Sequence, residues 1–191
     1  ANVGGVGLEN THPFQRELWG QAWSYAHNGQ VPSASNLENT RFSPIGTTDS
    51  ERIFCWLMDA LDRRFDAPPA PEVWAEYLSD LCESINAQGV FNLLLTNGKA
   101  LFAFCSTKLC WITRRAPFGV AYLSDKDLSI DFSTVTTEHD IVTMIATQPL
   151  THNENWHTMV SGECRLFVEG ESFWERNTQV VTHSREQDLM S

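Results

Sequence analysis

The spacing of apolar residues changes at Gly89, and this change limits the fold more than any other feature of the chain. Before Gly89, apolar residues recur at helical spacing in two segments. Their members are Phe54, Leu57, Met58, Leu61 and Phe65 in the first segment, and Trp74, Tyr77, Leu78, Leu81 and Ile85 in the second. After Gly89, apolar runs of strand length alternate with turn residues. Two consecutive helices followed by strands that hairpins can join predict an α+β fold rather than a doubly wound sheet.

The two helices have recognisable ends in the sequence. The first is expected over residues 50–65, and Thr48 and Asp49 stand where a helix N-cap is expected. A proline-rich segment over residues 67–71 then interrupts the chain, and the second helix opens near Pro71. Gly89 is expected to end this second helix, because glycine readily adopts the left-handed conformation that closes helices.

Five strands are expected after Gly89, over residues 90–96, 100–105, 109–113, 141–147 and 163–169. Asn97-Gly98 is expected to join the first two as a hairpin, because Asn-Gly tolerates the positive φ angles of a tight turn. The same dipeptide at 28–29 predicts that a short strand over residues 23–26 ends in a turn at His27-Asn28-Gly29. A polar loop over residues 30–47 then leads to the first helix.

Length and composition exclude several classes of protein. With 191 residues, the chain is expected to form one domain over residues 1–176 and a polar tail over residues 177–191. Its net charge of −11 offers no basic surface to a phosphate backbone, so nucleic acid is not expected as a partner. No apolar run approaches the roughly 20 residues that a membrane span needs. The five cysteines are odd in number and lack a C-x-x-C pair, which favours reduced thiols in a cytoplasmic protein.

Two positions have both a structural and a chemical interpretation. Asn28 and Gly29 on their own predict a hairpin turn, but an Asn amide and a Gly N–H can also converge on one developing oxyanion. Asp49 is either a helix cap or a carboxylate that pairs with the ammonium group of a ligand.

Three other sets of residues favour structural roles. His12, taken alone, favours a histidine held by backbone groups before a proline, and Arg114-Arg115 favours a solvated or salt-bridged strand end. The spacing of His152 and His157 does not match a metal site, so neither a metal nor another cofactor is expected. The cysteines lie mostly in apolar runs, where a thiol usually packs as an inert hydrophobic group, and none is nominated as a nucleophile.

Several motifs in a fixed order resemble a known family. They are Leu8-Glu9-Asn10-Thr11-His12-Pro13-Phe14, Ala26-His27-Asn28-Gly29-Gln30 and Thr48-Asp49-Ser50-Glu51, followed by the segments 112–119 and 145–151 with Asn153-Glu154 and Trp156. Together they resemble the class II glutamine amidotransferases, which are N-terminal nucleophile hydrolases. The last two segments are similar to a stand-alone bacterial branch, related to the yeast subunit that acts in glutathione breakdown.

The resemblance implies a four-layer αββα sandwich of two antiparallel sheets and the hydrolysis of glutamine to glutamate and ammonia. By this resemblance Asn28 and Gly29 form the oxyanion hole, and Asp49 receives the α-ammonium group of glutamine. His12 is expected to wall the glutamine pocket, and Asn2 matches a substrate-contacting position less closely.

The chain departs from the family pattern at its beginning. It starts just after the place of the family's His-x-Arg motif, so the first strands and the nucleophilic N-terminal cysteine are expected to lie outside residues 1–191. Residues 1–191 alone are therefore expected to be inactive. Alternatives are γ-glutamyl peptide hydrolysis with a metallopeptidase partner subunit, and a non-catalytic γ-glutamyl-binding scaffold. A homodimer is a further possibility for the assembly.

Overall fold

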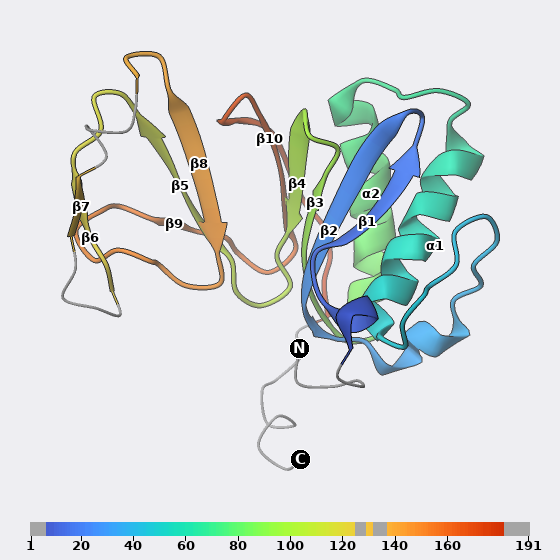
Figure 1. Ribbon diagram of the computed structural model, residues 1–191. Helices are drawn as coiled ribbons and strands as arrows, with labels where there is room; N and C mark the ends of the chain where they lie inside the picture. Colours follow the sequence, from blue (N-terminus) through green and yellow to red (C-terminus); the bar gives the residue numbers. More distant parts are fainter. Residues whose placement is uncertain (1–6, 125–128, 132–136, 182–191) are drawn as a thin grey trace, which may run out of the picture.

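The computed structural model describes residues 7–124, 129–131 and 137–181, which form an α+β fold with two larger antiparallel sheets. The six-stranded sheet has the order β1-β2-β3-β4-β10-β11, the three-stranded sheet has the order β8-β5-β9, and β6 pairs with β7. In Figure 1 the two helices cover one side of the six-stranded sheet, and the smaller sheets lie on its other side.

The bounds of the elements are as follows. The helices are α1 (Asp49–Arg64) and α2 (Pro71–Asn86), with short 3-10 turns η1 (Leu8–Asn10) and η2 (Pro32–Asn36). The six-stranded sheet consists of β1 (Phe14–Leu18), β2 (Gln21–Gln30), β3 (Val90–Thr96), β4 (Ala100–Phe104), β10 (Glu163–Val168) and β11 (Glu171–Asn177). The remaining strands are β5 (Cys110–Arg115), β6 (Val120–Tyr122), β7 (Ser129–Asp131), β8 (Ile141–Ala146) and β9 (His157–Thr158).

Two apolar clusters hold the layers together. The larger lies between the helices and the six-stranded sheet, where Trp23 of β2 meets Trp74 of α2 edge to face at 5.4 Å. The smaller includes Ala103 and Phe167 of the six-stranded sheet and Met159, with Trp111 of the three-stranded sheet packed against it. The described residues thus contain the helix layer and both sheet layers of the expected sandwich.

Both helices form where the apolar stripes predicted them. Phe54, Leu57, Met58 and Leu61 have no exposed surface, and in α2 the same holds for Leu78. The side chain of Thr48 caps α1 by accepting a hydrogen bond from the backbone N–H of Glu51 at 3.2 Å. α2 ends at Asn86 with Ala87 as its C-cap, so Gly89 lies just beyond the helix as predicted, but without the positive φ expected of it.

The strands differ from the predictions mainly near the N-terminus. The five predicted strands beyond Gly89 are confirmed to within a few residues as β3, β4, β5, β8 and β10. The strand predicted over residues 23–26 is instead the ten-residue β2, and the turn predicted at residues 27–29 is wrong. Strands β1, β6, β7, β9 and β11 were not predicted, and β1 forms a hairpin with β2 that aligns Leu18 with Gln21.

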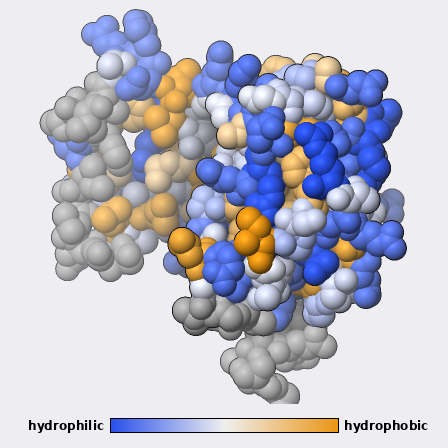
Figure 2. Space-filling view, turned by 45° about the vertical axis from the view of Figure 1, so that its right-hand side comes forward, coloured by the Kyte–Doolittle hydropathy of each residue, from blue (hydrophilic) through white to orange (hydrophobic). Residues whose placement is uncertain are grey.

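The surface agrees with the acidic composition. On the helical side, which is turned forward in Figure 2, hydrophilic residues predominate and apolar residues form small separate patches. Neither of the described helices is long and apolar enough to cross a membrane.

Candidate active site

Asn28 and Gly29 lie near the end of β2, inside the sheet. Their register partners on β3 are Asn92 and Phe91. Gly29 has φ +152°, and a Cβ atom built on it would lie 2.0 Å from the carbonyl oxygen of Val90. Only glycine fits this combination of conformation and close approach, so its role here is to let two backbones meet within a strand pair.

Asn92 connects Asn28 to the loop between β4 and β5. Its side chain donates hydrogen bonds to the backbone oxygen of Asn28 and to the hydroxyl of Thr107, both at 2.9 Å. Its Oδ1 accepts from the backbone N–H groups of Ser106, Thr107 and Lys108 at 3.0, 3.0 and 3.2 Å. Asn92 is only 3% exposed, and no motif marks it in the sequence, because it stands alone within an apolar strand.

His27 ties the same end of β2 to the beginning of α1. Its Nδ1 lies 2.9 Å from the hydroxyl oxygen of Ser50, and its Nε2 lies 3.3 Å from the carbonyl oxygen of Val90. Because a carbonyl can only accept, the proton belongs on Nε2, and Nδ1 accepts from Ser50. Burial lowers the pKa of His27, against the opposing charge of Asp49, so the ring is neutral at physiological pH.

Asp49 is the first residue of α1, and Thr48 takes the capping role that the sequence left open between them. Asp49 Oδ2 accepts from the backbone N–H of Val31 at 2.9 Å, just beyond the end of β2. Its Oδ1 accepts from the backbone N–H of Ser50 at 2.7 Å. The carboxylate therefore bridges the end of β2 and the N-terminus of α1, where the helix dipole favours a negative charge.

His12 lies before β1 and is partly exposed. Its ring meets the ring of Phe14 edge to face at 4.6 Å and stacks at 6.5 Å from the ring of Tyr25. Burial lowers the pKa of His12, and the charge of Asp49 opposes this effect. Its Nε2 atom is buried and has no hydrogen-bond partner among the described residues. Asn2, the remaining predicted site residue, lies outside the described residues.

The five cysteine thiols are all buried. Burial raises the pKa of each of them, to about 11 for Cys105 and to about 12 for Cys164. A buried thiol with a raised pKa contains little thiolate, which is the nucleophilic form. None of the five residues takes part in the hydrogen bonds that join Asn28, His27 and Asp49 to their neighbours.

Arg114 and Arg115 form ion pairs, as the sequence suggested. Arg114 Nε lies 2.7 Å from a carboxylate oxygen of Glu154, and Arg115 pairs with Glu171. Burial alone would raise the pKa of Glu154, but the hydrogen bonds from Arg114 and Thr151 hold it below its usual value. The segments 112–119 and 145–156, which resemble one branch of the family, are thus joined directly in the structure.

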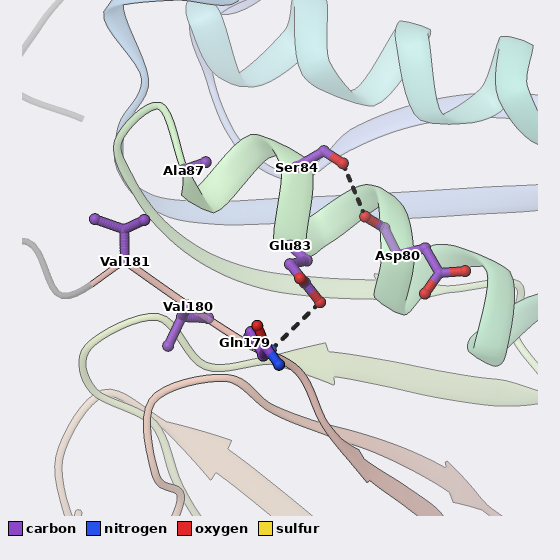
Figure 3. A pocket seen from close by; sticks show the side chains of 7 residues that line it. All are labelled: Asp80, Glu83, Ser84, Ala87, Gln179, Val180 and Val181. Carbon is purple, nitrogen blue, oxygen red and sulfur yellow. Dashed lines mark hydrogen bonds between the residues drawn. The ribbon is translucent and has the colours of Figure 1, made fainter.

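One cavity in the structure lies apart from the predicted site residues. A cavity of about 590 Å³ lies between the last turns of α2 and the segment after β11. Figure 3 shows Glu83 and Gln179 across this cavity, where a Glu83 carboxylate oxygen accepts from the Gln179 N–H at 3.3 Å. Among the residues that the structure describes, no group of three or more His, Cys, Asp or Glu side chains could hold a metal ion.

Comparisons with known proteins agree on one family. The model of the class II glutamine amidotransferases matches residues 1–190. The Escherichia coli K12 protein named "Putative glutamine amidotransferase YafJ" is 54% identical over 172 residues, which are 90% of this chain and 68% of that protein. A Haemophilus influenzae protein with the same family name is 41% identical over 175 residues, or 92% of this chain and 60% of that protein.

A solved structure is similar as well. The crystal structure of a predicted glutamine amidotransferase from Pseudomonas aeruginosa has a TM-score of 0.79 and 48% identity to this chain. The match covers 88% of this chain and 66% of the Pseudomonas protein. The chain thus spans about two thirds of the length of these similar proteins.

Proposed function

The chain belongs to the class II glutamine amidotransferases, and we propose that the whole protein hydrolyses the side-chain amide of glutamine to glutamate and ammonia. The observation that carries this proposal is the junction at the end of β2. There Asn28 and Gly29 lie within three residues of Val31, whose backbone N–H binds the Asp49 carboxylate. This arrangement supports an oxyanion site at Asn28 and Gly29 and an ammonium site at Asp49 at the same end of the sheet.

Two such sites at one end of β2 could bind the two ends of a small γ-glutamyl substrate. Asp49 offers a carboxylate to the α-ammonium group of glutamine, while Asn28 and Gly29 offer two N–H donors to the amide oxygen at the other end. Donors that are fixed before the reaction stabilise an oxyanion most, because they need no reorganisation when the charge develops. The neutral ring of His27, held by Ser50, adds to this rigidity without adding a charge.

We propose that the nucleophile is a cysteine of the whole protein outside these 191 residues. The support is that all five thiols within the chain are buried and have raised pKa values. In this mechanism a thiolate attacks the amide carbon of glutamine, and the negative charge forms on the amide oxygen at Asn28 and Gly29. The α-amine of that N-terminal cysteine acts as the general base and holds the proton taken from the thiol; when the C–N bond breaks, ammonia leaves with this proton, and water hydrolyses the thioester to glutamate.

The proposal is tested by comparing the whole protein with residues 1–191. The whole protein should release glutamate and ammonia from glutamine in equal amounts, and residues 1–191 alone should release neither. Release by residues 1–191 that survives replacement of all five cysteines by serine would overturn the proposed mechanism. Faster release of glutamate from γ-glutamyl peptides than from glutamine would instead assign the peptide as the substrate, and binding without hydrolysis would indicate a scaffold.

A further inference from the structure

We infer that Asn92 is a positioning residue of the oxyanion hole, which it serves by holding the peptide unit between Asn28 and Gly29. The inference rests on the proposed function, because it concerns the same reaction. Asn92 does not touch the substrate in this account. It acts through the backbone that carries one of the two oxyanion donors.

The peptide unit between Asn28 and Gly29 is planar. The carbonyl oxygen of Asn28 and the N–H of Gly29 belong to one peptide unit and point in opposite directions across it. The side-chain Nδ2 of Asn92 donates to that carbonyl oxygen at 2.9 Å. Fixing the direction of the carbonyl therefore also fixes the direction of the Gly29 N–H, which is the proposed oxyanion donor.

Gly29 is the position at which such a restraint matters most. Glycine has more conformational freedom than any other residue, and here its φ of +152° lies where other residues are rarely found. A flexible donor would lose part of its effect, because oxyanion stabilisation depends on donors that are oriented in advance. The hydrogen bond from Asn92 fixes the orientation of the Gly29 N–H, which the glycine would not hold by itself.

Asn92 is itself held from the opposite side. Its Oδ1 accepts from three consecutive backbone N–H groups, those of residues 106–108, at 3.0 to 3.2 Å. This loop is anchored in turn, because the Ser106 hydroxyl accepts from the N–H of Phe91 at 3.1 Å and the Ser106 carbonyl accepts from the Ser161 hydroxyl at 2.6 Å. The side chain of Asn92 thus links a fixed loop to the Asn28 carbonyl.

One substitution separates the two halves of this link. Asn92→Asp keeps an oxygen for the three loop N–H groups, and a carboxylate accepts such bonds more strongly than an amide does. The same substitution removes the Nδ2 donor and places a negative oxygen opposite the Asn28 carbonyl, while the Thr107 hydroxyl, which accepted from Nδ2, can donate to the new carboxylate instead. The loop should therefore remain in place while the Asn28–Gly29 peptide unit turns away from its present orientation.

Asn97 offers a matched control in the same strand pair. Its Oδ1 accepts from the N–H groups of Lys99 and Ala100 at 3.1 and 3.0 Å, and its Nδ2 donates to Gln21 Oε1 at 3.0 Å. It therefore makes the same kind of bonds as Asn92. It lies five residues further along, about 16 Å away in an extended strand.

The test compares Asn92→Asp with Asn97→Asp in the whole protein, using glutamine as the substrate. Asn92→Asp should lower kcat about 10- to 100-fold with KM changed less than about threefold, and Asn97→Asp should leave both constants unchanged. A native kcat in Asn92→Asp would overturn the inference, as would an equal loss of activity in both variants. If Asn92→Asp does not fold, Asn92→Ala gives the same comparison of kcat with KM, and a native kcat there overturns the inference too.

A second measurement distinguishes this inference from the proposed function. If the unmodified whole protein does not hydrolyse glutamine, the proposed function fails. The amide signal of Gly29 in NMR spectra of the whole protein then decides the inference by itself. A shift of that signal in Asn92→Asp but not in Asn97→Asp supports a positioning role, and an unchanged signal in both variants excludes it.

Discussion

The chain contains two Asn-Gly dipeptides, and they adopt different structures. Asn97-Gly98 turns the chain from β3 into β4, with φ +82° at Gly98. Asn28-Gly29 remains within β2, and both residues pair with the beginning of β3. The same two residues therefore form a hairpin at one place and part of a ladder at the other.

The difference lies in where the hydrogen bonds go. At Asn97 the side-chain oxygen accepts from Lys99 and Ala100, two and three residues further along the chain, and these bonds close the turn locally, while its Nδ2 donates to Gln21 of β2. At Asn28 the partner is Asn92, which is 64 residues away. A local turn signal is thus overridden when a distant strand offers regular pairing, and the glycine is then needed for close approach rather than for a turn.

The largest difference should appear when each glycine is replaced by alanine. Gly29→Ala places a Cβ atom 2.0 Å from the Val90 carbonyl oxygen, so the strand ends must separate and the proposed oxyanion donors move. We expect kcat to fall by about 10³-fold or more in the whole protein. Gly98→Ala has open space around the new Cβ atom and should cost only roughly 1–2 kcal/mol of stability, with native activity. Glutamine kinetics and urea unfolding measure the two effects, and equal kinetic losses would contradict this account.

The second largest difference should appear when each asparagine is replaced by alanine. Asn28→Ala should lower kcat about 10²–10³-fold with little change in KM, because the amide acts on charge that exists only in the transition state. Asn97→Ala should lower the free energy of unfolding by about 1 kcal/mol through its lost hydrogen bonds and leave kcat unchanged. Steady-state kinetics of both variants make the comparison. A rise in KM at constant kcat would make Asn28 a substrate-positioning residue instead.

Substitution of Asp49 tests whether the end of the sheet that carries Asn28-Gly29 also binds glutamine. In the whole protein, Asp49→Asn should weaken glutamine binding by about 2–5 kcal/mol, because it leaves the α-ammonium group without its charge partner. Thr48→Ala is the structural control, since it removes the helix cap and should cost roughly 1 kcal/mol of stability without affecting binding. Calorimetry on a variant whose nucleophilic cysteine is replaced by alanine measures the affinity. Unchanged affinity in Asp49→Asn would show that the carboxylate has only a structural role, through its hydrogen bonds with Val31 and Ser50.

The smallest expected effect concerns pH, and it follows from the residue before each dipeptide. His27 precedes Asn28 and titrates, whereas Thr96 precedes Asn97 and does not. Burial lowers the pKa of His27 in the folded state, against the charge of Asp49, and the nearby His12 lowers it further. The unfolded chain therefore binds a proton more readily, so this contribution to stability is complete above about pH 6.5 and is lost as the pH falls below that value.

Unfolding of the whole protein and of His27→Gln at several pH values checks this expectation. The variant should lose less stability than the unmodified protein between pH 7.5 and 5.5. A weak acid dependence should remain in the variant, because burial also lowers the pKa of His12. Parallel pH profiles for the two proteins would show that His27 does not carry the effect.

The strands near the N-terminus show the limits of local patterns. The apolar stripe of α1 and the run over Val90–Thr96 were predictable, because each element buries one set of side chains at a fixed spacing. β1, with its exposed and partly exposed centre, has no comparable signal and forms because it pairs with β2. β2 extends through Asn28 and Gly29 for the same reason, since it pairs with β3 along seven residues.

Residue types and their order determined the family, the two helices and the five strands with clear apolar runs beyond Gly89. They also singled out Asn28, Gly29, Asp49 and His12 as candidates. Only the tertiary structure decided the hydrogen-bond partners of this region. Asn92 binds the Asn28 carbonyl, Ser50 binds His27, and the Val31 N–H binds Asp49. The physical reason is that helical stripes and tight turns depend on interactions within a few residues. A hydrogen bond between residues 64 positions apart forms only once the sheet has assembled.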